Sequence, residues 1–348
     1  MSSGASAGAS TNVQRTHQSR AGKLATRLVA AVLILTSIVT FLYMGLSVYV
    51  AAQLGYEAPK PITETPAKYQ LQYRDVSFPA REDGVKLKGW FVPGQLSGGR
   101  LTAARTIIMV HGTRQNRATP NDGLIELTNI FVKAGFAVLG FDMRGTGESQ
   151  PEPLTLGYFE QRDVLGAVDF LQSGPIPYPE LGRPTIIGGW GVSMGAATLL
   201  LATAREQSIK AVVSDCAYSE IVPILQREVH VRSGLPEALT PGVLLAARAL
   251  YGVDYYAVRP VDVVASIAPR PIFFIHGDAD QYVPFADMQE LADAAQTGFQ
   301  AHVQTWAVHG VGHARSFKTT FNGPFNPEYG PRVVEFFTKS LGSDPAGA

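Results

Sequence analysis

The chain of 348 residues has few of the features that metal, redox or nucleic-acid chemistry requires. Its one cysteine, Cys216, has no partner for an intramolecular disulfide and no second thiol for a zinc site. Its 29 basic and 29 acidic side chains balance, so no broad charge attracts nucleic acid. It lacks a G-x-x-x-x-G-K-[ST] phosphate loop, and Met194 stands where a dinucleotide-binding fingerprint starting at Gly189 needs its third glycine. We therefore expect no cofactor, no metal and no nucleic-acid partner.

Charge is missing altogether from residues 28–54, "LVAAVLILTSIVTFLYMGLSVYVAAQL". As a helix this stretch is about 40 Å long, against roughly 30 Å for the hydrocarbon core of a bilayer. Basic residues precede it, and no acidic residue occurs before Glu57. We predict a single-pass transmembrane helix at residues 28–54, a basic disordered cytoplasmic tail at residues 1–27, and the rest of the chain on the far side of the membrane. The alternative is a long signal peptide, cut near Ala51 and Ala52.

The remaining chain alternates strand-like and helix-like runs, which predicts an α/β layered fold at residues 70–341. The proline-spaced residues 55–69 suggest an extended linker, and residues 342–348 a C-terminal tail. Strands are expected at residues 71–78, 86–93, 106–112, 136–142, 184–190, 209–215, 271–277 and 301–308, and helices at residues 123–135, 158–173, 194–206, 285–296 and 330–341.

One segment, at about residues 217–262, breaks the alternation. It contains two helical stretches, "YSEIVPILQREVHV" and "PGVLLAARALYG", with no strand between them. We interpret this segment as a helical cap inserted between two strands. The alternative is an ordinary long crossover.

The pentapeptide Gly191-Val192-Ser193-Met194-Gly195 follows a predicted strand and precedes a predicted helix. A strand that turns abruptly into a helix strains the serine backbone and leaves no room for neighbouring Cβ atoms, which explains glycine at both ends. This turn exposes the serine hydroxyl and directs the next amide toward it. Ser193 is therefore the candidate nucleophile, and Met194 the candidate donor of one oxyanion-binding N–H.

A serine nucleophile needs a histidine base, and that histidine needs an acid. Of the seven histidines, His309 and His313 lie on the loop after the last strand. We favour His313 because the small residues before it allow the loop to approach closely.

The loop "HGDADQYVP" offers Asp278 and Asp280 as the acid, and Asp215 ends the preceding strand. We favour Asp280, which lies deeper in its loop, and expect Asp278 to bind local backbone amides. The loop "HGTRQNR" follows the third strand, so we expect the amide of Thr113 to be the second oxyanion donor.

These residues resemble the α/β-hydrolase superfamily. The segments "HGTRQNR", "FDMRGTGES", "GVSMG", "HGDADQYVP" and "GVGHARSF" have its order and rough spacing over residues 70–341. The family's Ser…Asp…His order falls on Ser193, Asp280 and His313. The chain looks most like serine hydrolases described as dienelactone-hydrolase-like or serine-aminopeptidase-like, several of which carry an N-terminal membrane anchor. It departs from true dienelactone hydrolases, whose nucleophile is cysteine, and lacks the HGGG loop of many lipases.

The resemblance implies a mostly parallel sheet flanked by helices, with a small helical cap, and acyl transfer through an ester on Ser193. We expect hydrolysis of carboxylic esters without metal or cofactor, on a small-molecule or lipid-like acyl substrate. The alternatives are an acyltransferase acting on a cell-envelope acceptor, a peptidase, a thioesterase, or a non-catalytic scaffold with the hydrolase fold.

Overall fold

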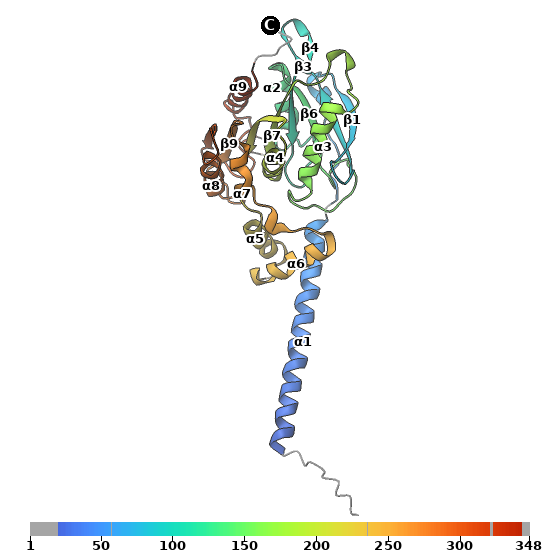
Figure 1. Cartoon of the computed structure of the whole chain (residues 1–348), viewed down its shortest axis with the longest axis vertical. Coiled ribbons are helices and arrows are strands. Elements are labelled where there is room, and N and C mark those ends of the chain that lie inside the picture. The colour runs from blue at the N-terminus through green and yellow to red at the C-terminus, as the bar shows by residue number, and fades with distance from the viewer. Residues whose placement is uncertain (1–19, 57, 235, 321–322, 343–348) are drawn as a thin grey trace, which may run out of the picture. The chain divides into compact units, whose positions relative to one another are not determined.

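A computed structural model describes residues 20–56, 58–234, 236–320 and 323–342 (Figure 1). The chain divides into two compact units, Met1–Leu46 and Ser47–Ala348. Most of the predicted N-terminal tail (residues 1–19) and nearly all of the predicted C-terminal tail (residues 343–348) lie outside the described residues.

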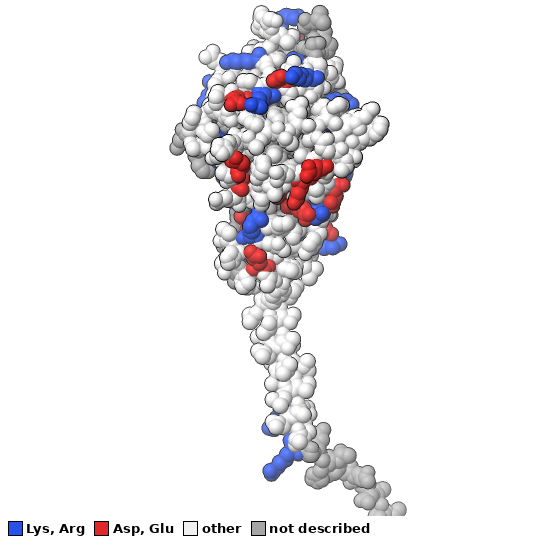
Figure 2. Space-filling view, turned by 90° about the vertical axis from the view of Figure 1, so that its left-hand side faces the viewer, with Lys and Arg blue, Asp and Glu red and all other residues white. Residues whose placement is uncertain are grey.

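The first long element is helix α1, Arg20–Gly55. It is long and apolar enough to cross a membrane. Figure 2 shows its surface uncharged beyond the basic side chains near its start. The prediction of disorder is wrong for residues 20–27, which form the first two turns of α1. Their Arg, Ala, Lys and Leu residues are good helix formers, and extending an existing helix gains one hydrogen bond for each residue added.

The last turns of α1 belong to the larger unit, which therefore begins at Ser47 and not at residue 70. Ser47, Val50, Ala51 and Gly55 are buried there. The segment predicted as a linker is held against this unit as well, because the Asn116 side-chain amide donates hydrogen bonds to the carbonyls of residues 60 and 61, each at 3.1 Å. A proline-spaced sequence predicts an extended path but cannot show which surface it follows.

The larger unit is built on an eight-stranded sheet in the order β1-β2-β6-β5-β7-β8-β9-β10. Strand β2 pairs antiparallel with β1 and β6, and all other neighbours are parallel. The predicted α/β-hydrolase fold is confirmed. The strands are β1 Arg74–Pro79, β2 Lys86–Val92, β5 Arg105–Val110, β6 Ala137–Asp142, β7 Ile186–Val192, β8 Ile209–Asp215, β9 Ile272–Gly277 and β10 Val303–Val308.

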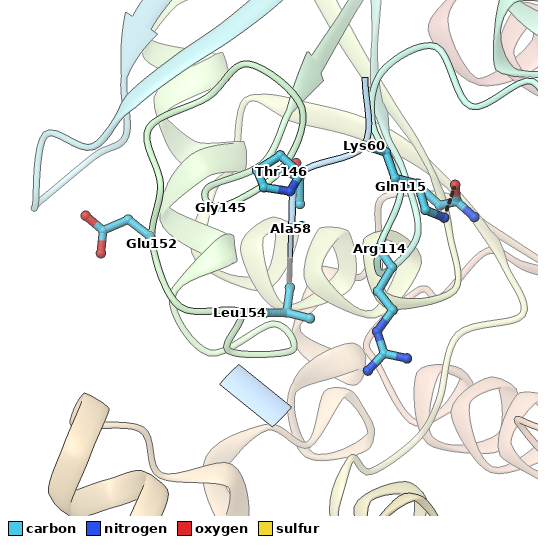
Figure 3. A pocket seen from close by; sticks show the side chains of 9 residues that line it. Ala58, Lys60, Arg114, Gln115, Gly145, Thr146, Glu152 and Leu154 are labelled. Atoms are coloured by element: carbon cyan, nitrogen blue, oxygen red, sulfur yellow. Dashed lines mark hydrogen bonds between the residues drawn. The ribbon is translucent and has the colours of Figure 1, made fainter. Parts of the chain in front are cut away.

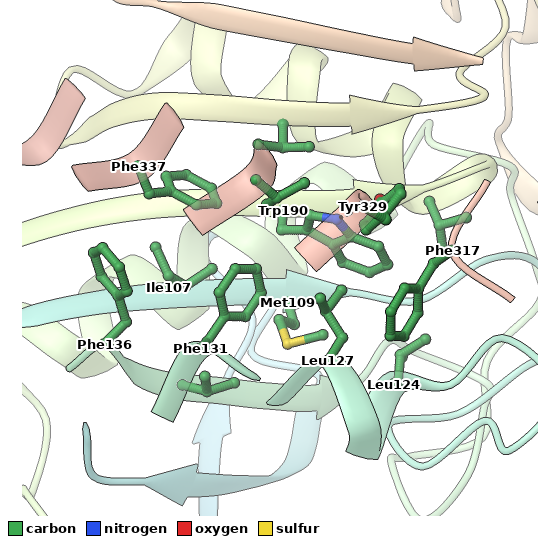
Figure 4. Close-up of a cluster of buried hydrophobic side chains, with 14 of the residues drawn as sticks. Ile107, Met109, Leu124, Leu127, Phe131, Phe136, Trp190, Phe317, Tyr329 and Phe337 are labelled. Carbon is green, nitrogen blue, oxygen red and sulfur yellow. Dashed lines mark hydrogen bonds between the residues drawn. The ribbon is translucent and has the colours of Figure 1, made fainter. Parts of the chain in front are cut away.

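Helices cover both faces of the sheet. The helices after α1 are α2 Leu124–Lys133, α3 Glu160–Ser173, α4 Met194–Arg205, α5 Val222–Ser233, α6 Thr240–Tyr251, α7 Pro260–Val263, α8 Phe285–Gln296 and α9 Tyr329–Leu341. Neighbouring glycines of β7 face opposite layers: a Cβ on Gly188 would meet Phe337 and Leu341 of α9, and one on Gly189 would meet Leu199 of α4. Figure 4 shows the core between the sheet and helices α2 and α9, with Phe131, Trp190 and Phe337 among its aromatic side chains.

Two further features of the fold bear on the predictions. Helices α5 and α6 both lie between β8 and β9 in the chain, as the segment interpreted as a cap requires. A two-stranded sheet of β3 (Gly94–Gln95) and β4 (Leu101–Thr102) was not predicted. Its strands have two residues each and flank a Gly/Ser-rich turn, so no alternating pattern is long enough to indicate them.

Candidate active site

Ser193 occupies the sharp turn between β7 and α4. Its backbone has φ 56° and ψ −125°, a conformation that is strained for a residue with a side chain. A Cβ on Gly191 would lie 2.6 Å from the Gly195 carbonyl oxygen, and one on Gly195 would lie 2.3 Å from the His111 carbonyl oxygen. No side chain therefore fits at either of the two flanking positions. The Ser193 amide donates a hydrogen bond to the Asp215 carbonyl at 2.8 Å, which attaches the turn to β8.

The structure brings Ser193, His313 and Asp280 into one hydrogen-bonded row. The distance from Ser193 Oγ to His313 Nε2 is 2.8 Å, and that from His313 Nδ1 to Asp280 Oδ2 is 2.7 Å. An ionised carboxylate only accepts hydrogen bonds, so Nδ1 carries the imidazole proton and Nε2 accepts from the serine hydroxyl. This is the tautomer in which a histidine can take a proton from serine.

Both oxygens of the Asp280 carboxylate have hydrogen-bond partners. Its Oδ1 accepts from the amides of Tyr282 and Val283 at 2.8 and 2.9 Å. Its Oδ2 also lies 3.3 Å from Nε2 of the buried His276, which donates to the Val283 carbonyl at 3.0 Å. Burial would raise the pKa of the Asp280 carboxyl, but hydrogen bonds from His276 and His313 outweigh burial and hold that pKa well below its usual range. The acid therefore stays ionised beside His313.

His276 is a contact that the sequence analysis missed. The sequence does contain an indication of this contact, because Asp280 follows His276 by four residues at the end of one strand.

The alternative pair, His309 and Asp278, forms a separate contact. His309 Nδ1 lies 2.8 Å from Asp278 Oδ2, and the His309 side chain is 96% exposed. Asp278 Oδ1 accepts from the Gly310 amide at 2.7 Å, the kind of local amide binding expected for this residue. The pair therefore joins the β9 and β10 loops, and it is His313 that reaches Ser193 Oγ.

Asp215, the third candidate acid, lies behind the row in the core. Its carboxylate accepts from Ser316 Oγ and from the Tyr329 hydroxyl, each at 2.8 Å. Burial raises the pKa of Asp215 to about 6, against the opposing effect of these two hydrogen bonds. Since Ser316 is three residues after His313, Asp215 helps to position the histidine loop.

Hydrogen bonds of His111 and Arg117 hold the loop that carries Thr113 in place. His111 Nε2 accepts from the Met143 amide at 3.1 Å, so its Nδ1 carries the proton and donates to the Gly112 carbonyl at 2.8 Å. Burial lowers the pKa of His111, which keeps the ring neutral in this structural role. Farther along the loop, the Arg117 amide donates to Asp142 Oδ1 at 2.7 Å, and the guanidinium binds the same carboxylate. Thr113 and Met194, the predicted oxyanion donors, both line a cavity with Ser193.

Two cavities of different character meet at Ser193. One is lined mainly by apolar side chains: Leu54, Leu154, Leu156, Ile221, Ile224 and Leu225. The other is wider and more polar, with Gln115, Asp122, His313 and Arg315 in its wall. Arg114 and Leu154 of the apolar cavity also line the adjoining pocket in Figure 3, which includes residues 58–60 of the segment predicted as a linker.

Three potential metal-binding atoms occur together within the described part of the chain. One ligand atom each from Cys216, Asp280 and His313 lies within 4.8 Å of the others. Burial raises the pKa of the Cys216 thiol well above its usual range, whereas metals bind the thiolate. The Asp280 and His313 atoms already bind each other. This chemistry fits a hydrogen-bonded catalytic row better than a resident metal.

The chain is similar to known proteins in sequence and in structure. Residues 50–307 match the family described as X-Pro dipeptidyl-peptidase (S15 family). The chain belongs to the S15 family. The esterase Pf2001 of Pyrococcus furiosus has a similar structure, with a TM-score of 0.64 and 26% identity over 82% of this chain and all of that one.

Two further proteins are similar in sequence to this S15 family member. The uncharacterized protein YfhR of Salmonella typhi is 27% identical over 76% of this chain and 82% of its own length. The thiohydrolase aneE of Aspergillus aculeatus is 31% identical over 49% of this chain and 52% of its own length. Together with the fold, the family identifies the chain as a serine hydrolase of the α/β-hydrolase superfamily.

Proposed function

We propose that this S15 family member hydrolyses carboxylic esters, with Ser193 as nucleophile, His313 as general base and acid, and Asp280 as the carboxylate that orients His313. The observation that carries the proposal is the row from Ser193 Oγ through His313 to Asp280, with hydrogen bonds of 2.8 and 2.7 Å. The esterase activity named for the Pyrococcus furiosus protein, whose structure is similar, supports the choice of ester over other acyl bonds.

The reaction has two steps. His313 takes the Ser193 proton as Oγ attacks the ester carbonyl, and then gives that proton to the departing alcohol, leaving an acyl group on Ser193. In the second step His313 takes a proton from water as the water oxygen attacks the acyl-enzyme, and then gives that proton to Ser193 Oγ as the acid departs. The amides of Met194 and Thr113 are the proposed donors to the oxyanion in both steps, each contributing about 3 kcal/mol.

The proposal extends to the location of the enzyme. Residues 28–46, the part of the predicted span that precedes the buried end of α1, hold it in a membrane as a single-pass helix, with the N-terminus cytoplasmic and the catalytic unit on the opposite side. The uncharged length of α1 and the basic residues at its start support this arrangement. Protease protection in sealed vesicles tests it. Digestion of the catalytic unit from the cytoplasmic side would contradict the orientation.

A second candidate is the release of dipeptides from the N-terminus of peptides. The name of the family favours it, and so do the carboxylates of Asp122 and Glu228 in the polar cavity beside Ser193, since such groups bind an N-terminal ammonium. Esters and peptides use the same row of side chains, so comparison of substrates has to separate the two activities.

The first test is labelling of the full chain in detergent with a fluorophosphonate, which reacts with activated serines. Wild type and the Ser266→Ala control, which alters an exposed serine, should label equally. Ser193→Ala should not label, and its kcat on an ester should fall about 10⁵-fold or more. Failure of folded wild type to label would contradict the assigned nucleophile.

Substrates then identify the reaction. We expect faster turnover of p-nitrophenyl butyrate than of Ala-Pro p-nitroanilide, with both reactions abolished in Ser193→Ala. The reverse order would favour the peptidase. Transfer of the butyryl group to an added alcohol in preference to water would favour an acyltransferase.

A further inference from the structure

The apolar cavity beside Ser193 has an unexpected wall. Leu54 is the last apolar residue of the long N-terminal helix, yet its half-buried side chain lines the cavity that contains Ser193. Another part of the wall comes from the segment that follows β8, including Ile221, Ile224 and Leu225. A segment predicted only to anchor the protein thus lies beside the nucleophile.

Several contacts fix the position of Leu54. The Gly55 carbonyl accepts a hydrogen bond from the Leu154 amide at 3.0 Å, and Leu154 lines the same cavity. Gly55 lies against the Tyr251 ring of α6, where an added Cβ would come within 2.9 Å of a ring carbon. Val50 and Ala51, on the preceding turn, are 4% and 1% exposed. The end of the helix is therefore built into the catalytic unit.

The wall formed by the segment after β8 is fixed as well. The hydroxyl of Tyr218 donates to the Leu156 carbonyl at 2.7 Å, and both residues line the cavity. This hydrogen bond connects the segment before α3 to the segment before α5. The apolar walls therefore have a defined spacing, which is what selection by length requires.

We propose that this cavity binds the acyl group of the substrate and that Leu54 limits the length of the acyl chain. The preferred substrates are esters of an apolar acyl chain, and the wider polar cavity receives the alcohol part. The assignment rests on the proposed function, because it takes Ser193 as the point where the two parts of the ester meet. Each methylene that enters the apolar cavity gains about fourfold in binding.

The test uses the full-length protein in detergent and p-nitrophenyl esters from acetate to decanoate, with kcat/KM measured for each. Leu54→Trp fills the cavity and should lower the octanoate-to-acetate ratio about tenfold or more while changing the acetate value little. Leu54→Ala enlarges the cavity and should raise the decanoate-to-butyrate ratio about fivefold. Val48→Ala, an exposed position on the same helix and in the same unit, should leave the profile unchanged.

Two further measurements separate the possible failures. Fluorophosphonate labelling reports whether each variant retains a folded site, and Ile224→Trp fills the same cavity from the segment after β8. It should shorten the preferred chain as Leu54→Trp does. If wild type labels but both tryptophan variants keep its chain-length profile, the acyl cavity is wrong while the proposed function stands. If wild type neither labels nor cleaves any ester, both proposals fall.

Discussion

Two histidine–aspartate pairs lie on the same two loops of this protein, and only one of them contacts Ser193, the candidate nucleophile. His313 and Asp280 are 2.7 Å apart, and His309 and Asp278 are 2.8 Å apart. The side chain of Asp280 is fully buried, whereas that of His309 is 96% exposed. The comparison shows that a short distance between histidine and carboxylate does not define a catalytic pair. Burial of the acid and contact with Ser193 distinguish the two.

The largest expected difference comes from the histidines. Replacing His313 with alanine removes the only described hydrogen-bond partner of Ser193 Oγ and should lower kcat about 10⁵-fold or more. His309→Ala removes an exposed ring and should change kcat less than about threefold. Steady-state hydrolysis of p-nitrophenyl butyrate measures both. Comparable losses in the two variants would mean that the second pair takes part in catalysis.

The acids should show a smaller contrast. In Asp280→Asn the side chain cannot accept from Nδ1–H as a carboxylate does, so His313 loses its preferred tautomer and kcat should fall about 10⁴-fold. Asp278→Asn keeps an acceptor for the Gly310 amide and should lower kcat less than about tenfold. A pre-steady-state burst of p-nitrophenol would show which step slows. Near-normal turnover by Asp280→Asn would contradict the assigned acid.

Asp215 extends the comparison to a carboxylate that is buried but touches no histidine in the row. Its pKa is raised from about 3.9 in the unfolded chain to about 6, so the folded protein holds this proton more tightly. The stabilisation from this group is fully present below pH 4 and is lost as pH rises to 6. Relative to Asp215→Asn, the free energy of unfolding of wild type should fall by up to about 3 kcal/mol over that range.

Urea unfolding at several pH values, monitored by tryptophan fluorescence, measures this difference. A gap between wild type and Asp215→Asn that does not depend on pH would show that the carboxyl does not titrate in this range. Ser316→Ala removes one hydrogen bond to the same carboxylate and should therefore raise its pKa further.

Much of the fold could be predicted because the strands are short apolar runs and the helices have regular apolar spacing. The turn at Ser193 was also predictable, since glycine is required on both sides by local space. The order of motifs suggested His313 and Asp280, and the structure places these two side chains next to Ser193. Their catalytic roles stay predictions.

What could not be predicted depends on contacts between distant segments. In an apolar stretch such as residues 28–54 no periodicity is visible, so the buried positions Ser47, Val50 and Ala51 could not be separated from exposed ones. They follow the spacing of one helix face. The hydrogen bond from Leu154 to Gly55 joins segments about 100 residues apart, and local sequence contains no record of it.

The burial of Ala51 bears on the order of events during biosynthesis. A signal peptidase needs an extended and accessible segment, but the bond between Ala51 and Ala52 lies within α1, and Ala51 is 1% exposed. A peptidase can therefore cleave this bond only before the catalytic unit folds. A chain cut at that stage would fold with Leu54 close to a free N-terminus, so processing at this bond would alter the helix that carries one wall of the proposed acyl cavity.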